Sequence, residues 1–253
     1  MRLTVLGSGT VVPEPGRACA SYYIEAGAVR LLLDCGPGAT QAMAACGLPW
    51  TVLTHIAISH FHTDHIGDLP YLLFALKYGL DAPRTEPLMV LGPTGTVDML
   101  RALAGAFGSY ILDPGFRLTT RELGAGHQAP LAPGVRLAAL KSNHTEESIA
   151  YRLESDGATL GYTGDTGPDD ALAYWLRGVD LLLAECSLPD DLGFDRHMTP
   201  TSVAALASIA QPRRLLLTHV YPQLDRRALP RLVADAGWPG EVVVAEEGGT
   251  LEV

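Results

Sequence analysis

Lysine is scarce in this sequence, and neither a long apolar run nor a closely spaced cysteine pair occurs in it. Lys77 and Lys141 are the only lysines, and 18 Lys and Arg residues stand against 28 Asp and Glu, for a formal net charge of −10. Binding to nucleic acid over a wide surface requires Lys and Arg to neutralise phosphates. The charge therefore argues against a broad nucleic-acid-binding module.

The apolar runs and the cysteines both bear on where the protein works. No apolar run approaches the ~18 residues of a membrane helix, and the first residues lack the apolar core of a signal peptide. The cysteines contain no C-x-x-C pair, and we expect them to be reduced thiols. They are Cys19, Cys35, Cys46 and Cys186. We therefore expect a cytoplasmic protein without a membrane segment.

The sequence contains enough apolar residues for a large core. It has 253 residues, of which 47% are hydrophobic and 18% charged, and it has no low-complexity stretch or linker. We expect one domain over residues 1–253. The last third alternates helix and strand, and the centre reads as antiparallel hairpins, which together predict an α/β protein with mixed sheets and outer helices. The predicted strands are 3–6, 20–25, 30–34, 55–59, 87–91, 116–123, 135–141, 148–154, 159–163, 179–184, 213–218 and 241–245. The predicted helices are 38–46, 66–80, 95–107, 168–176, 200–210 and 225–236.

The densest group of metal-binding residue types follows the strand predicted at 55–59. His60, His62, Asp64 and His65 fall within six residues. Imidazole and carboxylate are ordinary protein ligands of zinc and similar ions. In an extended segment, residues two apart share a face, so His60 and His62 point the same way. Asp64 and His65 can then turn toward a second centre.

Other predicted strands also end in residues that bind metals or protons. These residues are Asp34, His144, Asp165, Glu185 and His219. Sites in α/β sheets form beyond the carboxyl ends of strands, so we expect these side chains to converge on one cleft with the histidine cluster. The resulting seven His and Asp ligands exceed one tetrahedral ion and suit two ions about 3.5–4 Å apart. Such a pair activates water near neutral pH, which predicts hydrolysis.

The segment 59–67, Ser-His-Phe-His-Thr-Asp-His-Ile-Gly, resembles the H-x-H-x-D-H signature of the metallo-β-lactamase superfamily. The resemblance continues through Asp34, His144, 162–166 and 218–219 and so covers almost the whole chain. It implies an αβ/βα sandwich of two mixed sheets with helices on both outer faces. Asp34 is then an orienting carboxylate or a turn residue. The ligands that the resemblance implies are His60, His62 and His144 for one ion and Asp64, His65 and His219 for the other, with Asp165 bridging.

A narrower resemblance to the ribonuclease Z group and related small phosphodiesterases rests on 183–187 and 196–200. It implies that His197 contacts the scissile phosphate or protonates the leaving oxygen and that Glu185 orients His197. A carboxylate can do this because it fixes the tautomer of an imidazole. With Asp64, which also binds metal, these are the residues assigned to catalysis. Thr199, before Pro200, is expected to cap a helix.

One departure from ribonuclease Z affects the expected substrate. In ribonuclease Z a long arm that clamps tRNA lies between the motifs of His144 and Asp165. Here a short hairpin, 148–163, takes that place. We therefore predict a hydrolase with two divalent ions that cleaves a small or cyclic phosphodiester or nucleotide by attack of a metal-bridging hydroxide. Zinc is the expected metal, with manganese or iron as alternatives.

Several alternatives remain open from the sequence. The same metal centre could serve a ribonuclease Z-like RNA endonuclease, or a hydrolase of lactones, thioesters or sulfate esters. A non-enzymatic alternative is a metal-holding scaffold. Members of the family are often dimers, so a homodimer is also open.

Overall fold

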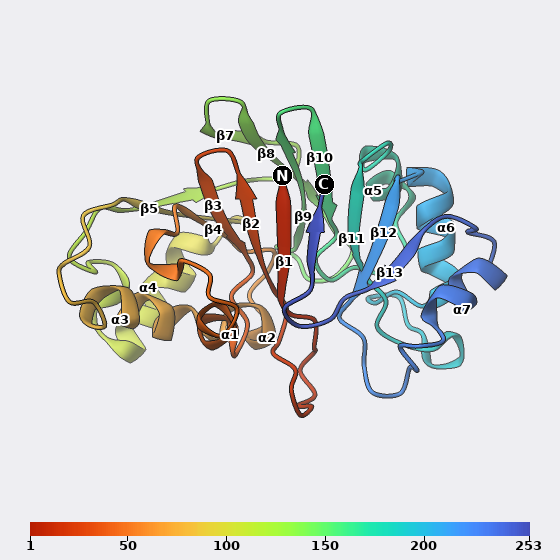
Figure 1. Cartoon of the computed structure of the whole chain (residues 1–253), viewed down its shortest axis with the longest axis horizontal. Helices are drawn as coiled ribbons and strands as arrows, with labels where there is room; N and C mark the ends of the chain where they lie inside the picture. The colour runs from red at the N-terminus through yellow and green to blue at the C-terminus, as the bar shows by residue number, and fades with distance from the viewer.

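Two β-sheets face each other in the computed structural model, which describes all 253 residues, and helices cover the outer side of each sheet (Figure 1). Each sheet has seven strands. The N- and C-terminal strands lie side by side near the middle of the molecule. The helix–sheet–sheet–helix layering is the one that the sequence predicts.

The first sheet contains the six strands of the N-terminal half and the last strand of the chain. In order across the sheet these are β14 (Thr250–Glu252), β1 (Arg2–Gly7), β2 (Ser21–Ala26), β3 (Val29–Leu33), β4 (His55–Ala57), β5 (Leu88–Gly92) and β6 (Leu118–Glu122). Pairing is antiparallel from β14 to β3 and parallel from β3 to β6. The helices of this half are α1 (Ala39–Ala45), α2 (Thr63–Ile66), α3 (Leu69–Tyr78) and α4 (Thr96–Phe107), with short 3-10 turns at Trp50–Val52 and Ser109–Ile111.

The second sheet repeats this pattern with the other strands. In order they are β7 (Gln128–Ala132), β8 (Val135–Lys141), β9 (Ile149–Ser155), β10 (Ala158–Tyr162), β11 (Leu181–Glu185), β12 (Arg214–Thr218) and β13 (Val242–Val244). Pairing is antiparallel from β7 to β10 and parallel from β10 to β13. The helices are α5 (Asp170–Trp175), α6 (Pro200–Ala210) and α7 (Leu229–Asp235), with a 3-10 turn at Asp190–Leu192. The two halves therefore share one topology.

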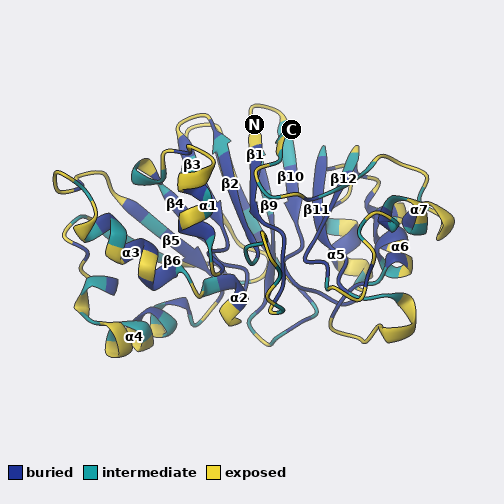
Figure 2. Cartoon of the chain, turned by 60° about the horizontal axis from the view of Figure 1, so that its bottom comes forward, coloured by how far each residue is buried: buried dark blue, intermediate teal, exposed yellow.

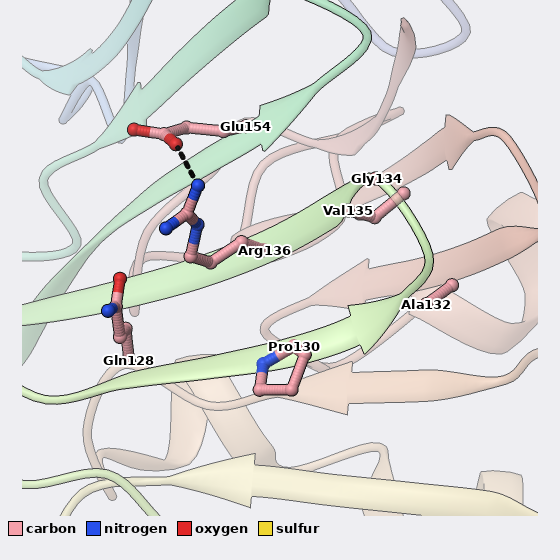
Figure 3. Close-up of a pocket in the computed structure, with 7 residues that line it drawn as sticks. All are labelled: Gln128, Pro130, Ala132, Gly134, Val135, Arg136 and Glu154. Atoms are coloured by element: carbon pink, nitrogen blue, oxygen red, sulfur yellow. Dashed lines mark ion pairs between the residues drawn. The ribbon is translucent and has the colours of Figure 1, made fainter.

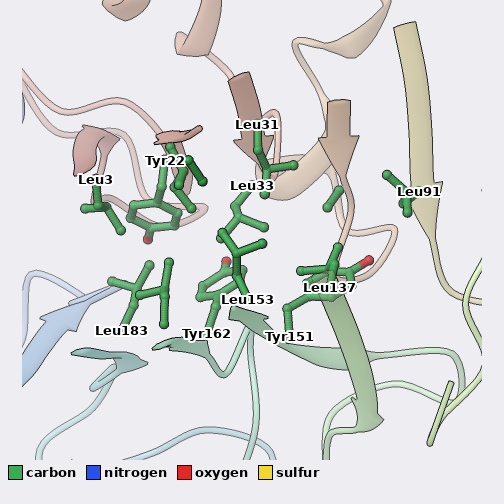
Figure 4. Close-up of a cluster of buried hydrophobic side chains, with 14 of the residues drawn as sticks. Leu3, Tyr22, Leu31, Leu33, Leu91, Leu137, Tyr151, Leu153, Tyr162 and Leu183 are labelled. Carbon is green, nitrogen blue, oxygen red and sulfur yellow. The ribbon is translucent and has the colours of Figure 1, made fainter. Parts of the chain in front are cut away.

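The main core lies between the two sheets (Figure 4). Leu3, Tyr22 and Leu33 come from the first sheet and pack in one cluster with Leu153 and Leu183 of the second. The outer faces of the sheets are buried as well, by the helices, so the central strands are mostly dark blue and the outward sides of the helices yellow in Figure 2. A parallel strand covered on both faces requires a continuous apolar run, which explains the leucine runs that ended in polar residues in the sequence.

Two strands and one short helix were not predicted. β7 contains Pro130, which cannot donate to a ladder, and it lies at a sheet edge, where proline is tolerated. β14 has only three residues. The helix predicted over 66–80 is confirmed as α3, which is shorter at both ends, whereas the separate short helix α2 before it was not predicted. Pro70 in the first turn of α3 fits a new helix start.

The helices are short throughout. The longest, α4, has 12 residues, and no helix combines the length and the apolar character needed to cross a membrane. Helix α6 begins where the sequence predicted, since the Thr199 side chain accepts from the Ser202 amide and Pro200 follows the cap.

The hairpin predicted at 148–163 is confirmed as β9 and β10. The two strands are joined at Asp156 and Gly157, whose φ angles of 51° and 81° are both positive. Two successive residues with positive φ form a type I′ turn, whose twist matches that of the two strands it connects. Because the connection is this short, no arm projects between His144 and Asp165.

Candidate functional site

The polar residues at the predicted strand ends come together in the structure, at the edge of the sandwich that carries α2, which is labelled in Figure 1. They lie in the short segments directly after β3, β4, β8, β10 and β12, except for Glu185, which is the last residue of β11. Parallel neighbours end at the same sheet edge, and both sheets present this edge to the same side of the molecule. The structure thus brings together residues that are as far apart in sequence as Asp64 and His219.

The seven predicted ligands form two adjoining groups. In each group, one nitrogen or oxygen per residue lies within 4.8 Å of those of the other members. The first group is His60, His62, His144 and Asp165, and the second is Asp64, His65 and His219. The grouping coincides with the division into two ions that the resemblance implies.

Asp165 lies between the two groups. Its carboxylate oxygens are 3.9 Å from His60 Nε2 and 3.8 Å from His144 Nε2 in the first group. They are 3.3 Å from His65 Nε2 and 3.6 Å from His219 Nε2 in the second. Ligands bound at about 2.0–2.1 Å in a tetrahedron are about 3.3 Å apart. The spacing is therefore that of side chains gathered around ions, with Asp165 placed to serve both.

The hydrogen bonds of three imidazoles leave lone pairs turned inward. The Ser59 hydroxyl donates to Asp34 at 2.7 Å, so it accepts from His60 Nδ1 at 3.0 Å. His65 Nδ1 donates to Asp34 at 2.7 Å. His144 Nδ1 donates to the Arg196 carbonyl at 2.9 Å. When these rings are neutral, each carries its one proton on Nδ1 and its lone pair on Nε2, as a metal ligand must. The Nε2 of His144 faces His62 Nδ1 at 3.1 Å.

Two of these nitrogens provide the clearest test of fit to a metal. His60 Nε2 and His65 Nε2 are buried and have no hydrogen-bond partner. Burial is the main cause, and the nearby His65 the second, that holds the pKa of His60 well below its ordinary value, so the His60 ring is neutral. Burial also opposes charge on His65, but Asp165 and Asp34 together raise the pKa of His65 well above its ordinary value. Orphaned buried nitrogens beside carboxylates that favour positive charge fit divalent cations.

Asp34 is the hub of the hydrogen bonds that orient two of the histidines, His65 directly and His60 through the Ser59 hydroxyl. It is fully buried and accepts four hydrogen bonds: from the Ser59 amide and hydroxyl at 2.7 Å each, from His65 Nδ1 at 2.7 Å and from the Tyr162 hydroxyl at 2.6 Å. Its φ of 53° is in the left-handed region. Such backbone strain persists where the surroundings over-determine it. The geometry matches an orienting carboxylate rather than a plain turn residue.

Replacing Asp34 should destabilise the metal-free protein. In Asp34→Asn the amide NH₂ would face buried donors, and we expect the free energy of unfolding to fall by about 3 kcal/mol. Tyr162→Phe removes one of the four bonds and should cost only about 1 kcal/mol. Denaturant unfolding of both variants without metal measures this. Equal stability of Asp34→Asn and the unmodified chain would contradict the hub role.

Glu185 and His197 form the predicted pair at the border of the second group. His197 Nδ1 is 2.9 Å from Glu185 Oε1 and 3.1 Å from Oε2, and both residues are buried. Burial alone would lower the pKa of His197, but its hydrogen bond to Glu185 raises that pKa above the ordinary value. A ring nitrogen of His197 also lies within 4.8 Å of ligand atoms of Asp165 and His219. The pair thus places a proton-carrying ring beside the ligand cluster.

Sequence reasoning missed several residues that support the site. Ser59, Tyr162 and Ser187 hold the site carboxylates and histidines through hydrogen bonds. Ser59 and Ser187 lie one and two residues from His60 and Glu185, and this proximity was the only signal available. The other two histidines, His55 and His127, lie outside both ligand groups.

The site opens to the surface and is flanked by apolar and acidic side chains. Phe194, 54% exposed, stands 5.3 Å from the His197 ring. Phe61, which stands between His60 and His62 in the sequence, lines a hollow with Thr94, Glu146 and Glu147. The pocket drawn in Figure 3 lies elsewhere, on the β7–β8 hairpin and β9. Its only charged groups are those of one ion pair, and it contains none of the seven predicted ligands.

Comparison with known proteins agrees with this geometry. The chain matches the Beta-lactamase superfamily domain over residues 29–220. It is 30% identical to the Ribonuclease Z of Mycobacterium bovis BCG, over all of this chain and 98% of that protein. It is 28% identical to the Ribonuclease Z of Haloferax volcanii, over all of this chain and 95% of that protein.

Solved structures show the same fold. The metallo-β-lactamase fold protein YhfI from Bacillus subtilis superposes with a TM-score of 0.85 at 24% identity, covering 99% of this chain and 98% of YhfI. The short form of human tRNase Z gives 0.78 at 23%, covering 100% and 99%. A diphosphatase of the PhnP family gives 0.74 at 21%, covering 100% and 97%. The family model matches most of this chain, and a relative at 30% identity matches all of it. This chain therefore belongs to the metallo-β-lactamase superfamily of metal-dependent hydrolases.

Proposed function

We propose that this hydrolase is a two-metal phosphodiesterase that acts on a small phosphodiester or nucleotide. The observation that carries the proposal is the position of Asp165 between two ligand groups, with the Glu185–His197 pair adjoining it. A metal-holding scaffold would need the ligands but not the pair.

In this proposal each ligand group holds one divalent ion. His60, His62 and His144 would hold the first ion, and the second group, Asp64, His65 and His219, would hold the other, with Asp165 shared. Two divalent ions in these positions would supply Lewis-acid activation of water and of a phosphoryl oxygen. Nitrogen-rich sites with carboxylates suit zinc, and also manganese or iron.

His197 would serve the leaving oxygen of the substrate. Its Nδ1 is held by Glu185, so the proton available for transfer is on Nε2. No hydrogen bond within the protein engages Nε2, whereas Glu185 also accepts from the Thr166 and Met198 amides and is thereby fixed. A ring held in this way can donate to a leaving oxygen without first reorienting. Asp64 supports catalysis by completing the second ion site.

The surroundings of the site favour a small substrate over a structured RNA. The β9–β10 connection is a tight turn, so nothing at this point of the chain reaches out to clamp a tRNA. Glu146 and Glu147, two and three residues after His144, add negative charge to this part of the surface, which disfavours a polyanion. The relatives named Ribonuclease Z make an RNA endonuclease the second candidate, while the PhnP-family neighbour is a diphosphatase.

Hydrolysis assays separate these candidates. The zinc- and manganese-loaded protein should hydrolyse bis(p-nitrophenyl) phosphate and small cyclic or linear nucleotide diesters faster than it cleaves a precursor tRNA. A panel of lactones, thioesters and sulfate esters tests the carbon and sulfur alternatives. No phosphodiester turnover with either metal at full occupancy would sink the proposal, and faster cleavage of tRNA would replace it with the RNA endonuclease.

We further propose that residues 1–253 act as one unit in a reducing compartment. The two sheets share one core, so neither half has a complete core of its own. All four cysteines are free thiols, as expected where disulfides do not form.

A further inference from the structure

Ser187 lies where three segments of the site meet. Strands β11 and β12 run parallel with Glu185 opposite Thr218, so the residues just beyond both strands become neighbours. The Ser187 amide donates to the Met198 carbonyl at 2.9 Å, and the Ser187 carbonyl accepts from the Tyr221 amide at 3.1 Å. Ser187 is fully buried. Its backbone is therefore held on both sides, and its hydroxyl has a fixed position.

The hydroxyl of Ser187 touches both Glu185 and His219. It is within hydrogen-bond distance of Glu185 Oε2 and lies 3.0 Å from His219 Nδ1. The Glu185 carboxylate and the His219 carbonyl, which is 2.9 Å from the hydroxyl, both only accept, so the hydroxyl proton goes to one of them and the hydroxyl oxygen accepts from His219 Nδ1. That leaves the lone pair of His219 on Nε2, the nitrogen that faces Asp64 at 3.3 Å and Asp165 at 3.6 Å.

We propose that Ser187 is a positioning residue that fixes His219 for a metal ion and joins it to the Glu185–His197 pair. The inference rests on the proposed two-metal function. One carboxylate, Glu185, then orients two rings, His197 directly and His219 through the Ser187 hydroxyl. The ligand and the proton donor are held by the same group.

Removal of the hydroxyl leaves one polar group without its partner and takes one of several hydrogen bonds from another. In Ser187→Ala the Nδ1–H of His219 loses its acceptor, and Glu185 loses one donor, in a part of the protein closed to water. The His219 backbone has a φ of 54°, in the left-handed region, so the ring sits on a constrained residue. Groups that hydrogen-bond to metal ligands typically change metal affinity by about 10–100-fold when removed.

The loss of metal affinity in Ser187→Ala should affect only one of the two ions. The ligands of the first group have partners that do not involve Ser187, since His60 Nδ1 bonds to Ser59 and His144 Nδ1 to Arg196. Ser187→Ala should thus weaken the ion of the second group and leave the first ion bound.

Zinc titration of the metal-free protein against a chromophoric chelator tests the inference without an activity assay. We expect the unmodified chain to bind two ions. Ser187→Ala should bind one ion with unchanged affinity and the other about 10–100-fold more weakly, and Ser187→Thr, which keeps the hydroxyl, should restore most of the affinity. The matched control is Ser155→Ala, a buried serine at the end of β9 away from both ligand groups, which should bind both ions normally.

The outcomes distinguish this inference from the proposed function. An unmodified chain that binds no zinc would defeat the two-metal function itself. Two ions in the unmodified chain with equal affinities in Ser187→Ala, or an equal loss in the Thr and Ala variants, would overturn the role of Ser187 alone. If Ser187→Ala does not fold, Ser187→Cys replaces it. A thiol is a weak donor and acceptor, so we expect its second affinity to lie below that of Ser187→Thr.

Discussion

Asp165→Asn should reduce the bound ions from two to at most one and lower phosphodiester hydrolysis by at least about 10³-fold. The carboxylate of Asp165 lies within 4 Å of Nε2 of four histidines, so its charge serves both ligand groups. Asparagine keeps the shape and removes the charge. Metal Lewis acids contribute several kcal/mol to transition-state stabilisation, and about 1.4 kcal/mol is tenfold in rate. Elemental analysis and kcat/KM measure the two effects together.

A second aspartate controls for a general effect of charge loss. Asp180 precedes β11 at the opposite edge of the same sheet, where it accepts from the Thr159 amide and hydroxyl at 2.8 and 2.9 Å. Asp180→Asn should keep two ions and near-normal turnover. Retention of both ions and of full activity in Asp165→Asn would show that Asp165 does not link two metal sites.

His197→Ala should lower kcat by about 10²–10⁴-fold while both ions stay bound. This loss is expected for a diester with an alkoxide leaving group, because that oxygen needs a proton to depart. A p-nitrophenolate leaves without one, so hydrolysis of bis(p-nitrophenyl) phosphate should fall much less. The ratio of the two losses therefore reports proton donation, and metal analysis of the same samples reports ligation.

His127→Ala is the matched control for this variant. His127 is exposed and outside both ligand groups, so its removal should change neither substrate's turnover. Loss of an ion in His197→Ala would make His197 a metal ligand. Equal losses with both substrates would make it a phosphate-binding group instead of a proton donor.

The strands that carry the site could be predicted because their physics is local. Buried parallel strands need unbroken apolar runs, and the first polar residue after each run marks the sheet edge. Leu31, Leu32 and Leu33 before Asp34 are one example, and 181–185 is another, ending in Glu185. The convergence of these ends follows from parallel pairing.

The supporting residues could not be predicted because long-range packing decides their partners. Tyr162 reaches Asp34 across 128 positions of sequence, and no spacing rule connects them. Ser187 resembles any small polar residue after a strand until the register of β11 and β12 brings His219 beside it. The edge strand β7 was hidden by Pro130, whose tolerance depends on its place at the end of the sheet.

Anomalous diffraction from crystals of the zinc-loaded protein tests the central claim most directly. The account predicts two zinc peaks about 3.5–4 Å apart on either side of Asp165. One peak should be bound by the histidines at 60, 62 and 144, and the other by Asp64, His65 and His219. A single peak, or a peak whose ligands include His197, would contradict a two-metal centre served by a separate proton donor.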